Sequence, residues 1–459
     1  MNKLLFLLTI ILLCSCHLKT SYKAPLVELP TDWNKYSVSN KQNTKEEKKQ
    51  WWSRFNDTIL DSLIEESLEA NSDILLAMTN VSKAQAQLTL NKTHRLPQIG
   101  LQGAMKQSRA NATNKTVNSF SLAAVLNYEF DLWGAVARGN EAARASLLAA
   151  NYNQDAIKLT VTSNVAIAYF NVLALEKELS ITKELVAIQE EIYELNKKIF
   201  QSGAGDLITL NKAQSALSVT QAELPSIEQS LMEQEKALAV LLARTPKEIV
   251  NGKLRKAKLI DGLPSTVIVP KILPSELLER RPDIRAAEAY LVAADAGVAL
   301  AKAAYFPSIS LTGLLGLDST KLNKLFNNSA INSNFGSAIA GPLIDFGRTG
   351  ANVKIAEETK KQYIIQYQQN VRTAFGEVMN YLSAQQTSHD NFEFSKRNER
   401  SLEEVMKITL QRYSHGVGTY LDVLNAKQIL FQAKINKVNV KLKQLTASVN
   451  LFHALGGDW

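Results

Sequence analysis

The chain contains nearly the same phrase twice, as SGAGDLITLNKAQ at residues 202–214 and as HGVGTYLDVLNAKQ at residues 415–428. Each phrase stands between two long helical patterns. Other matched positions keep almost the same separation: Asp131 matches Asp345, and Leu210 matches Leu424, each 214 residues apart. A register kept over so many segments indicates an internal duplication. We therefore expect one body made of two similar halves, although the length would suit two or three ordinary domains.

Each half begins with two segments of alternating polarity, near 97–108 and 118–131 in the first half and near 307–317 and 334–345 in the second. The period of two predicts β-strands. A sandwich in a soluble protein would also show this pattern. However, each segment has about ten residues, the length that crosses an outer membrane at a tilt. The apolar face of the second segment ends in aromatic side chains, like a membrane girdle, and it comprises Phe120, Leu122, Ala124, Leu126, Tyr128 and Phe130, with Trp133 just beyond.

Four transmembrane strands per chain are too few to close a barrel. A sheet in lipid cannot leave open edges, and about eight strands make the smallest closed barrel. The sequence therefore predicts that several chains share one barrel.

The helical patterns are unusually long. The segment from about Ala135 to Gln201 would form a helix of roughly 100 Å. Apolar residues at spacings of four and three predict coiled-coil seams, and in this segment they are Ile181, Leu185, Ile188, Ile192, Leu195 and Ile199. The duplicated phrase is then the tip of an antiparallel helical hairpin, where paired glycines (Gly203 with Gly205, Gly416 with Gly418) give the backbone freedom to reverse. The predicted fold class is mainly α with a small β part.

The N-terminus MNKLLFLLTIILLCSC is typical of a bacterial lipoprotein leader. Leu13 stands three residues before Cys16, and the small Ser15 directly precedes it. We expect residues 1–15 to be removed and Cys16 to carry S-diacylglycerol and N-palmitoyl groups. Cys14 is a poorer candidate because the bulky Leu13 precedes it. An ordinary signal peptide with incidental cysteines remains the alternative.

Composition excludes several classes of function. The net charge is +8, but basic residues alternate with Glu along helical faces, which makes nucleic acid an unlikely partner. The five histidines have no metal-ligand spacing, and no nucleophile or phosphate-loop motif occurs, so we expect no enzyme, no catalytic residue and no metal. No uninterrupted run of about 18 apolar residues follows the leader, so no helix is expected to span a membrane.

The sequence divides into five parts. After the leader, residues 16–50 form a lipidated extended segment. Residues 51–245 form the first repeat, with its tip near 203–205. Residues 246–275 connect the halves. Residues 276–457 form the second repeat, with its tip near 416–418.

The chain resembles the TolC-like outer-membrane factors, in the lipoprotein branch that serves tripartite efflux pumps. The resemblance covers essentially the whole mature chain in the expected order. The stretches that carry it are VLNYEFDLWGAVARGNEAARA (125–145), ALAVLLARTP (237–246), LLERRPDIRAAEAYLVAADAGVALAKAAYFPSISLTG (277–313), GPLIDFGR (341–348), QRYSHGVGTYLDVLNAKQ (411–428) and LFHALGG (451–457).

The resemblance implies a homotrimer with a 12-stranded β-barrel in outer-membrane lipid, above a periplasmic α-barrel of antiparallel coiled coils. Such proteins are passive exit ducts. A periplasmic adaptor protein links them to an inner-membrane transporter, often of the RND type. An exit duct for polypeptides in type I secretion and an envelope coiled-coil lipoprotein without a channel remain the alternatives.

The resemblance also places two sites. The adaptor would contact the hairpin tips, and acidic residues just inside the second tip would narrow the periplasmic entrance. Asp422 takes one acidic position, and Asn425 stands where some relatives carry another Asp. Glycines needed only for the turn, and an ordinary exposed carboxylate at Asp422, are the simpler alternatives. The expected tip residues are Gly203, Ala204, Gly205, Arg412, Tyr413, Gly416, Val417 and Gly418.

Overall fold

The computed structural model describes residue 25, residues 28–30, residue 33, and residues 50–110, 115–251, 260–264 and 274–457. The predicted lipidation site Cys16, most of the segment 16–50 and much of the connecting segment 246–275 lie outside these residues.

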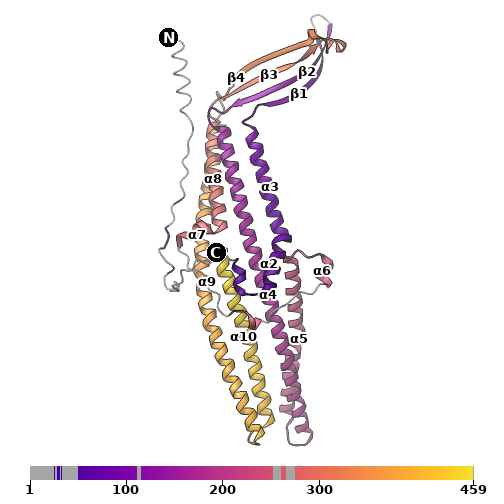
Figure 1. Ribbon diagram of the computed structural model, residues 1–459, viewed down its shortest axis with the longest axis vertical. Helices are drawn as coiled ribbons and strands as arrows, with labels where there is room; N and C mark the ends of the chain where they lie inside the picture. Colours follow the sequence, from indigo (N-terminus) through magenta and orange to yellow (C-terminus); the bar gives the residue numbers. More distant parts are fainter. Residues whose placement is uncertain are drawn as a thin grey trace. The chain divides into compact units, whose positions relative to one another are not determined.

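Long helices make up most of the described chain (Figure 1). The two halves repeat the same succession of two strands, a helix of 67 residues and a helix of 35 residues. The helices are α2 (Thr58–Ala70), α3 (Ser72–Thr93), α4 (Ala135–Gln201), α5 (Leu207–Leu241), α6 (Pro246–Asn251), α7 (Pro274–Arg280), α8 (Pro282–Ala303), α9 (Arg348–Ser414) and α10 (Tyr420–Ala454), with short 3-10 helices η2 (Trp51–Phe55), η3 (Ile260–Gly262), η4 (Leu322–Lys324) and η5 (Asn328–Ala330).

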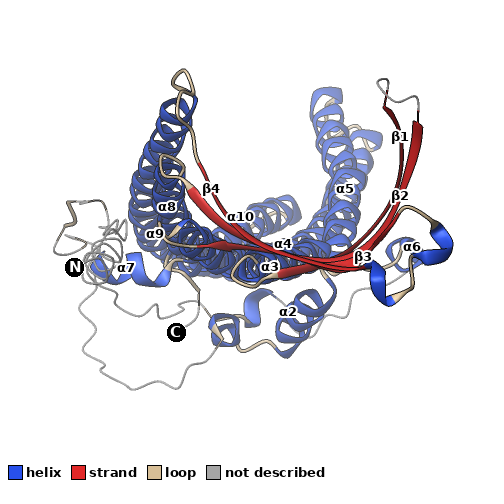
Figure 2. Cartoon of the chain, turned by 90° about the horizontal axis from the view of Figure 1, so that it is seen from above, coloured by secondary structure: helices blue, strands red, loops and turns tan. Residues whose placement is uncertain are grey.

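Four strands form one antiparallel sheet in the order β1 (Gln98–Ala110), β2 (Lys115–Phe130), β3 (Ser308–Ser319), β4 (Ile331–Ala340). Seen from above, the sheet is strongly curved (Figure 2). The pairing of β2 with β3 joins the two halves, and β1 and β4 are left as its edges. The predicted combination of long helices with four strands is confirmed.

One face of this sheet is apolar and exposed. The register pairs Leu101 with Ala124, Ala124 with Leu315, and Gly313 with Phe335, so alternate residues of all four strands share this face. Leu101 is 79% exposed and Phe335 is 73% exposed. The opposite face carries polar residues such as Gln102 and Asn334. No described element covers the large apolar side chains. In a water-soluble protein, by contrast, the apolar face of a sheet is buried in the core.

Aromatic side chains mark the end of the sheet next to the helices. Tyr128 and Phe130 contact each other, with ring centroids 4.9 Å apart. Trp133 stacks on Phe306 at 4.6 Å, and its Nε1 donates to the carbonyl of Pro307 at 2.7 Å. This anchored indole agrees with the aromatic girdle that the sequence predicts.

Helices next to the sheet begin with aspartate caps. Asp131 accepts hydrogen bonds from the backbone N–H groups of Val136 and Ala137, and Asp345 accepts from those of Gly347 and Thr349. Both carboxylates therefore serve the first turns of α4 and α9.

The described chain divides into two compact units. The first contains the sheet with residues 79–152 and 284–370, and the second contains residues 28–78, 153–283 and 371–459. The core of the second unit includes Trp51 and Phe55, at the start of the predicted first repeat. Trp51 stacks on Phe452 of α10, with centroids 5.8 Å apart.

The predicted coiled-coil seam is buried where the hairpin helices pack. Ile181, Leu185, Ile188 and Ile192 of α4 are all less than 9% exposed. Among the described residues, α4 alone has an 18-residue stretch that by length and composition could cross a membrane, and 56% of that stretch is buried within the protein. The apolar composition of α4 therefore fits a core helix.

Candidate functional site: the hairpin tips

The first tip joins α4 to α5 through a tight helix end. Gly203 has a φ of 77°, the left-handed conformation that glycine adopts without steric cost. Its N–H donates to the carbonyl of Phe200 at 3.0 Å, and the N–H of Ala204 donates to the carbonyl of Ile199 at 3.1 Å. These two bonds define a Schellman motif, which satisfies the last carbonyls of α4.

The second tip, between α9 and α10, repeats this motif. Gly416 has a φ of 74°, and its N–H donates to the carbonyl of Tyr413 at 3.0 Å. The N–H of Val417 donates to the carbonyl of Arg412 at 2.9 Å. The duplicated phrase thus encodes the same helix end twice.

The two glycines of each pair have different roles. Gly205 and Gly418 do not have a positive φ, so the expectation that both glycines supply conformational freedom applies only to Gly203 and Gly416. A Cβ at Gly205 would lie 3.0 Å from Cγ2 of Ile199 and 3.2 Å from the backbone N of Phe200. A Cβ at Gly418 would meet its nearest atoms at an ordinary 3.5 Å. Gly418 is therefore the one glycine of the four that the turn itself does not require.

Each returning helix begins with a capped N-terminus. Asp206 accepts from the N–H of Thr209 at 2.9 Å. Thr419 and Asp422 form a reciprocal capping box, in which Thr419 N donates to Oδ2 of Asp422 at 2.9 Å and Asp422 N donates to Oγ1 of Thr419 at 3.2 Å. The hydrogen bonds from the backbone N–H and then the hydroxyl of Thr419 hold the pKa of Asp422 below its ordinary value.

Asp422 is exposed although it caps the helix, and Asn425, one turn on, is exposed beside it. The charge of Arg412 contributes to the lowered pKa of Asp422. The structure therefore brings together one exposed acidic group and one amide at the start of α10, with Arg412 near the carboxylate.

Aromatic residues link the second tip to the first hairpin. The rings of Tyr413 and Tyr420 lie 5.4 Å apart. The hydroxyl of Tyr420 donates to Oε2 of Glu191 on α4 at 3.1 Å. Leu424 on α10 packs in one small core with Ile188 and Ala213 of the first hairpin. Tyr413 thus braces the start of α10, while Val417, 68% exposed, lies at the surface of the tip.

Sequence reasoning missed three residues of this site. Thr419 could have been found from the Thr-x-x-Asp spacing that is typical of a capping box. Tyr420 and Glu191 are 229 positions apart, so no local pattern predicts their contact.

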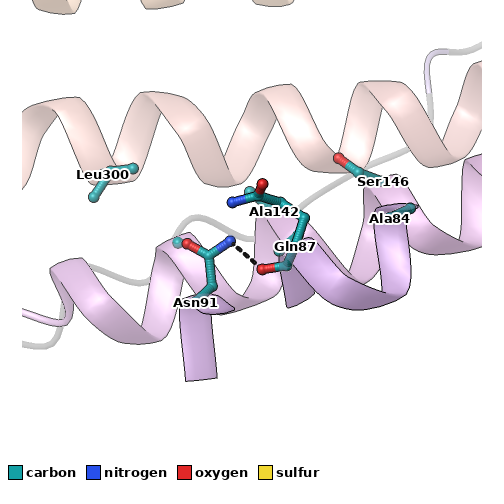
Figure 3. A pocket seen from close by; sticks show the side chains of 8 residues that line it. Ala84, Gln87, Asn91, Ala142, Ser146 and Leu300 are labelled. Atoms are coloured by element: carbon teal, nitrogen blue, oxygen red, sulfur yellow. Dashed lines mark hydrogen bonds between the residues drawn. The ribbon is translucent and has the colours of Figure 1, made fainter. Parts of the chain in front are cut away.

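Metal binding at the tips or elsewhere finds no support among the described residues. No group of three or more His, Cys, Asp or Glu side chains in the described part of the chain could hold a metal ion. A groove of about 320 Å³ lies against α3, α4 and α8, and in it the amide of Asn91 donates to the carbonyl of Gln87 at 2.9 Å (Figure 3). None of its lining residues is charged, and they are Ala84, Gln87, Asn91, Gly139, Ala142, Ala143, Ser146 and Leu300.

Comparison with known families decides the class of protein. The sequence model of the family described as outer membrane efflux protein matches residues 63–244 and 273–457. The chain belongs to this family.

Members with similar sequences include the cation efflux system protein CusC of Escherichia coli O6:H1, which is 32% identical over 470 residues, covering 100% of this chain and 99% of that protein. The probable outer membrane lipoprotein SilC of Salmonella typhimurium is 30% identical, with the same coverage. Among solved structures, the Campylobacter jejuni outer membrane channel CmeC matches with a TM-score of 0.86 at 26% identity, covering 96% of this chain and 95% of that one. A structure of CusC matches with a TM-score of 0.83 at 30% identity, covering 96% of this chain and 100% of that one.

Membership of this outer membrane efflux family establishes the class of function. The chain is an outer-membrane efflux channel of a tripartite system, and it is not an enzyme. The predicted family, fold class and location are confirmed.

Proposed function

We propose that three copies of this chain close one 12-stranded barrel and form the passive exit duct of a small-molecule efflux pump. The observation that carries the proposal is the sheet itself, with an exposed apolar face and two edge strands, β1 and β4. Such edges are too costly to leave open in lipid. Pairing β4 of one copy with β1 of the next removes every edge, and three copies give a barrel within the observed size range.

Similarity to known efflux proteins favours small molecules as cargo. The names of related proteins describe efflux or export of cations, antibiotics, toluene and pyoverdine. Small-molecule efflux by this chain, rather than type I secretion of polypeptides, is supported by these similarities. Deleting the gene and screening metal ions, drugs, dyes and bile salts for increased sensitivity tests this cargo class, and sensitivity to none of them would contradict it.

The hairpin tips are the proposed contact with a periplasmic adaptor, which couples the duct to an inner-membrane transporter of the RND type. Both tips have the same helix end. Ala204 and Val417 are exposed at the tips, and Gly418 has no side chain. Small residues allow another backbone to approach closely. Of the tip glycines, Gly418 can be changed with the least effect on the turn.

Replacing Gly418 separates docking from folding. Gly418→Trp should abolish efflux in cells while the outer-membrane abundance of the protein stays unchanged, because a bulky side chain holds the adaptor away. Gly418→Ala is the matched control and should retain efflux. Full resistance in the Gly418→Trp strain would show that this tip does not contact the adaptor.

Cys16 is the proposed site of lipid attachment, which supports anchoring in the outer membrane in addition to the barrel. The small Ser15 and the Leu13 three residues before Cys16 support the assignment. Cys16→Ser should lose incorporation of radiolabelled palmitate, whereas Cys14→Ser should keep it. Labelling that persists in Cys16→Ser would contradict the assignment.

A further inference from the structure

The end of the sheet remote from the helices is a distinct surface. The chain enters β1 from α3 and leaves β2 for α4, and it enters β3 from α8 and leaves β4 for α9. The end of β1, the start of β2 and the β3–β4 connection therefore all lie at the opposite end of the strands (Figure 1). We call this surface the distal end and define it by the described residues 106–110, 115–119 and 318–331.

The β3–β4 connection is an ordered structure rather than a simple turn. It contains η4 and η5, and Leu325 and Ala330 are buried in it. The N–H of Lys324 donates to the carbonyl of Lys321 at 3.0 Å, and the N–H of Ala330 donates to that of Asn327 at 2.9 Å. Its surface side chains are therefore carried by a folded backbone.

This folded connection exposes two large apolar side chains that are close in sequence to two cations. Leu322 is 60% exposed and Phe326 is 75% exposed. Lys321 and Lys324 are exposed beside them. An apolar body with neighbouring cations is the combination that suits the boundary between acyl chains and head groups, where Lys and Arg extend to the polar side.

The charge at the distal end is divided between the faces of the sheet. Arg109 pairs with Thr116 and lies on the same face as Leu101 and Met105, the apolar face. On the opposite face, Lys106 and Asp318 carry opposite charges. The apolar face thus ends in Arg109 on β1, and the β3–β4 connection adds Lys321 and Lys324 at the same end of the sheet. Asp318 is the one carboxylate among the described residues of the distal end.

We propose that the distal end binds the phosphate groups of an anionic lipid head group, with Arg109, Lys321 and Lys324 facing the phosphates and Leu322 and Phe326 contacting the acyl region. The inference rests on the proposed barrel, because only a sheet that crosses the membrane brings its apolar face and this end to the lipid boundary. Charge complementarity and the exposed apolar pair identify the occupant as lipid rather than free phosphate. Cations near such a surface contribute binding that decreases with ionic strength.

The test uses the full chain, extracted as its native oligomer in detergent, and measures binding of fluorescently labelled lipid A with two phosphates. The double variant Lys321→Gln/Lys324→Gln should bind about 25-fold more weakly, since about fivefold for each lysine corresponds to ~1 kcal/mol. Arg109→Gln should bind about fivefold more weakly. Lys106→Gln is the matched control on the other face and should change the affinity less than twofold.

Two further binding measurements distinguish a lipid head group from free phosphate. Lipid A with one phosphate should bind more weakly than the form with two, and millimolar inorganic phosphate should not compete. Equal binding of phosphatidylcholine, competition by inorganic phosphate, or an equal loss in Lys106→Gln would overturn the proposal. Conductance of the parent in phosphatidylcholine bilayers tests the barrel separately, so a channel that conducts but ignores lipid A contradicts only this inference.

Discussion

Nη1 of Arg281 lies 2.7 Å from Oε2 of Glu377, which ties the residue before α8 to the middle of α9. The same guanidinium donates to Oδ2 of Asp283 at 2.7 Å and to the backbone carbonyl of Ala454 at 3.0 Å. Arg281 is only 5% exposed. Arg281 therefore joins α8, α9 and the end of α10 within one chain, and it also satisfies a carbonyl at the end of α10.

Replacing Arg281 should destabilise the protein. Arg281→Met leaves the carbonyl of Ala454 without this donor, while the partly exposed Asp283 and Glu377 carboxylates can regain water, so we expect a loss of about 2–3 kcal/mol. The adjacent Arg280, which forms an exposed i,i+4 pair with Glu276, is the matched control, and Arg280→Met should cost less than about 0.5 kcal/mol. Thermal unfolding followed by circular dichroism measures both, and equal losses would show that the contacts of Arg281 contribute little.

Alanine at the two glycines of the second tip should have different effects. Gly416→Ala puts a Cβ on a left-handed residue and should destabilise the end of α9 by about 1 kcal/mol. Gly418→Ala meets only ordinary contacts and should be close to neutral. Hydrogen exchange of the amides near residues 411–417 reports the difference, and equal protection in both variants would contradict the assignment of the turn to Gly416.

A charge on the apolar face of the sheet should impair membrane assembly. Leu101→Lys places an ammonium group in lipid and should cost about 2–4 kcal/mol near the bilayer centre. Gln102→Lys, one residue further on the polar face, should be tolerated because that side faces the lumen of the proposed barrel. Folding into bilayers of defined thickness at increasing urea concentration measures the two costs. A larger cost for Gln102→Lys than for Leu101→Lys would show that the face of Gln102, not that of Leu101, contacts lipid.

Removing the charge of Asp422 tests the proposed entrance. Asp422→Asn should reduce the preference of reconstituted channels for cations, because a ring of three carboxylates concentrates cations at a constriction. Thr419→Ala removes the capping hydroxyl but keeps the carboxylate, so it should retain cation preference. Unchanged selectivity in Asp422→Asn would leave Asp422 as a helix cap only.

The pH dependence of this selectivity follows from the lowered pKa of Asp422. A carboxyl whose pKa lies below the ordinary 3.8 stays ionised until the pH falls below that value. Cation preference should therefore persist at pH 4.5 and decline only in stronger acid. Conductance measured between pH 7 and pH 3 shows where it is lost.

Lys441 should make stability depend on pH in alkaline solution. Its buried ammonium group donates to the carbonyls of Leu263 at 3.0 Å and Pro264 at 2.9 Å. Burial lowers its pKa to about 8; the charge of Asp261 opposes this shift, whereas that of Lys396 adds to it. Between pH 8 and the ordinary value of 10.5, the unfolded chain binds a proton that the folded chain has released, so stability rises with pH in this window.

A neutral substitution isolates the effect of Lys441. As the pH rises from 8 to 10, the free energy of unfolding of the parent should increase relative to that of Lys441→Met, by at most about 1.4 kcal/mol per pH unit. Thermal unfolding at each pH measures this as a rise in the melting temperature of the parent relative to the variant. Below pH 8 the difference between the two proteins should be constant. The exposed Lys443→Met should follow the parent throughout, and a flat difference from pH 7 to 10 would contradict the shifted pKa.

Much of the fold could be predicted because it rests on short-range periodicity. Alternation along residues 118–131 correctly assigned the face of Leu126, and the register of three strand pairs places that face beside Gly313. The spacing of apolar residues in α4 likewise identified the buried seam at Ile188 and Ile192. The positions of both tips follow from the duplicated phrase, since a Schellman motif is local.

What could not be predicted depends on contacts between distant segments. The partners of Arg281 lie 96 and 173 positions away, so its direction cannot be read from the motif ERRPDI. Trp51 follows a polar segment, and its burial results from packing against Phe452. The different roles of Gly416 and Gly418 depend on φ angles, which an identical residue type does not reveal.

The two unpaired rims of the curved sheet also constrain how the molecule reaches its destination. If the proposed barrel is shared between copies, a solitary copy would expose hydrogen-bonding groups to hydrocarbon along both β1 and β4, so we expect copies to meet before or during entry into the bilayer. The rate of insertion should then rise more steeply than linearly with the supply of newly secreted subunits.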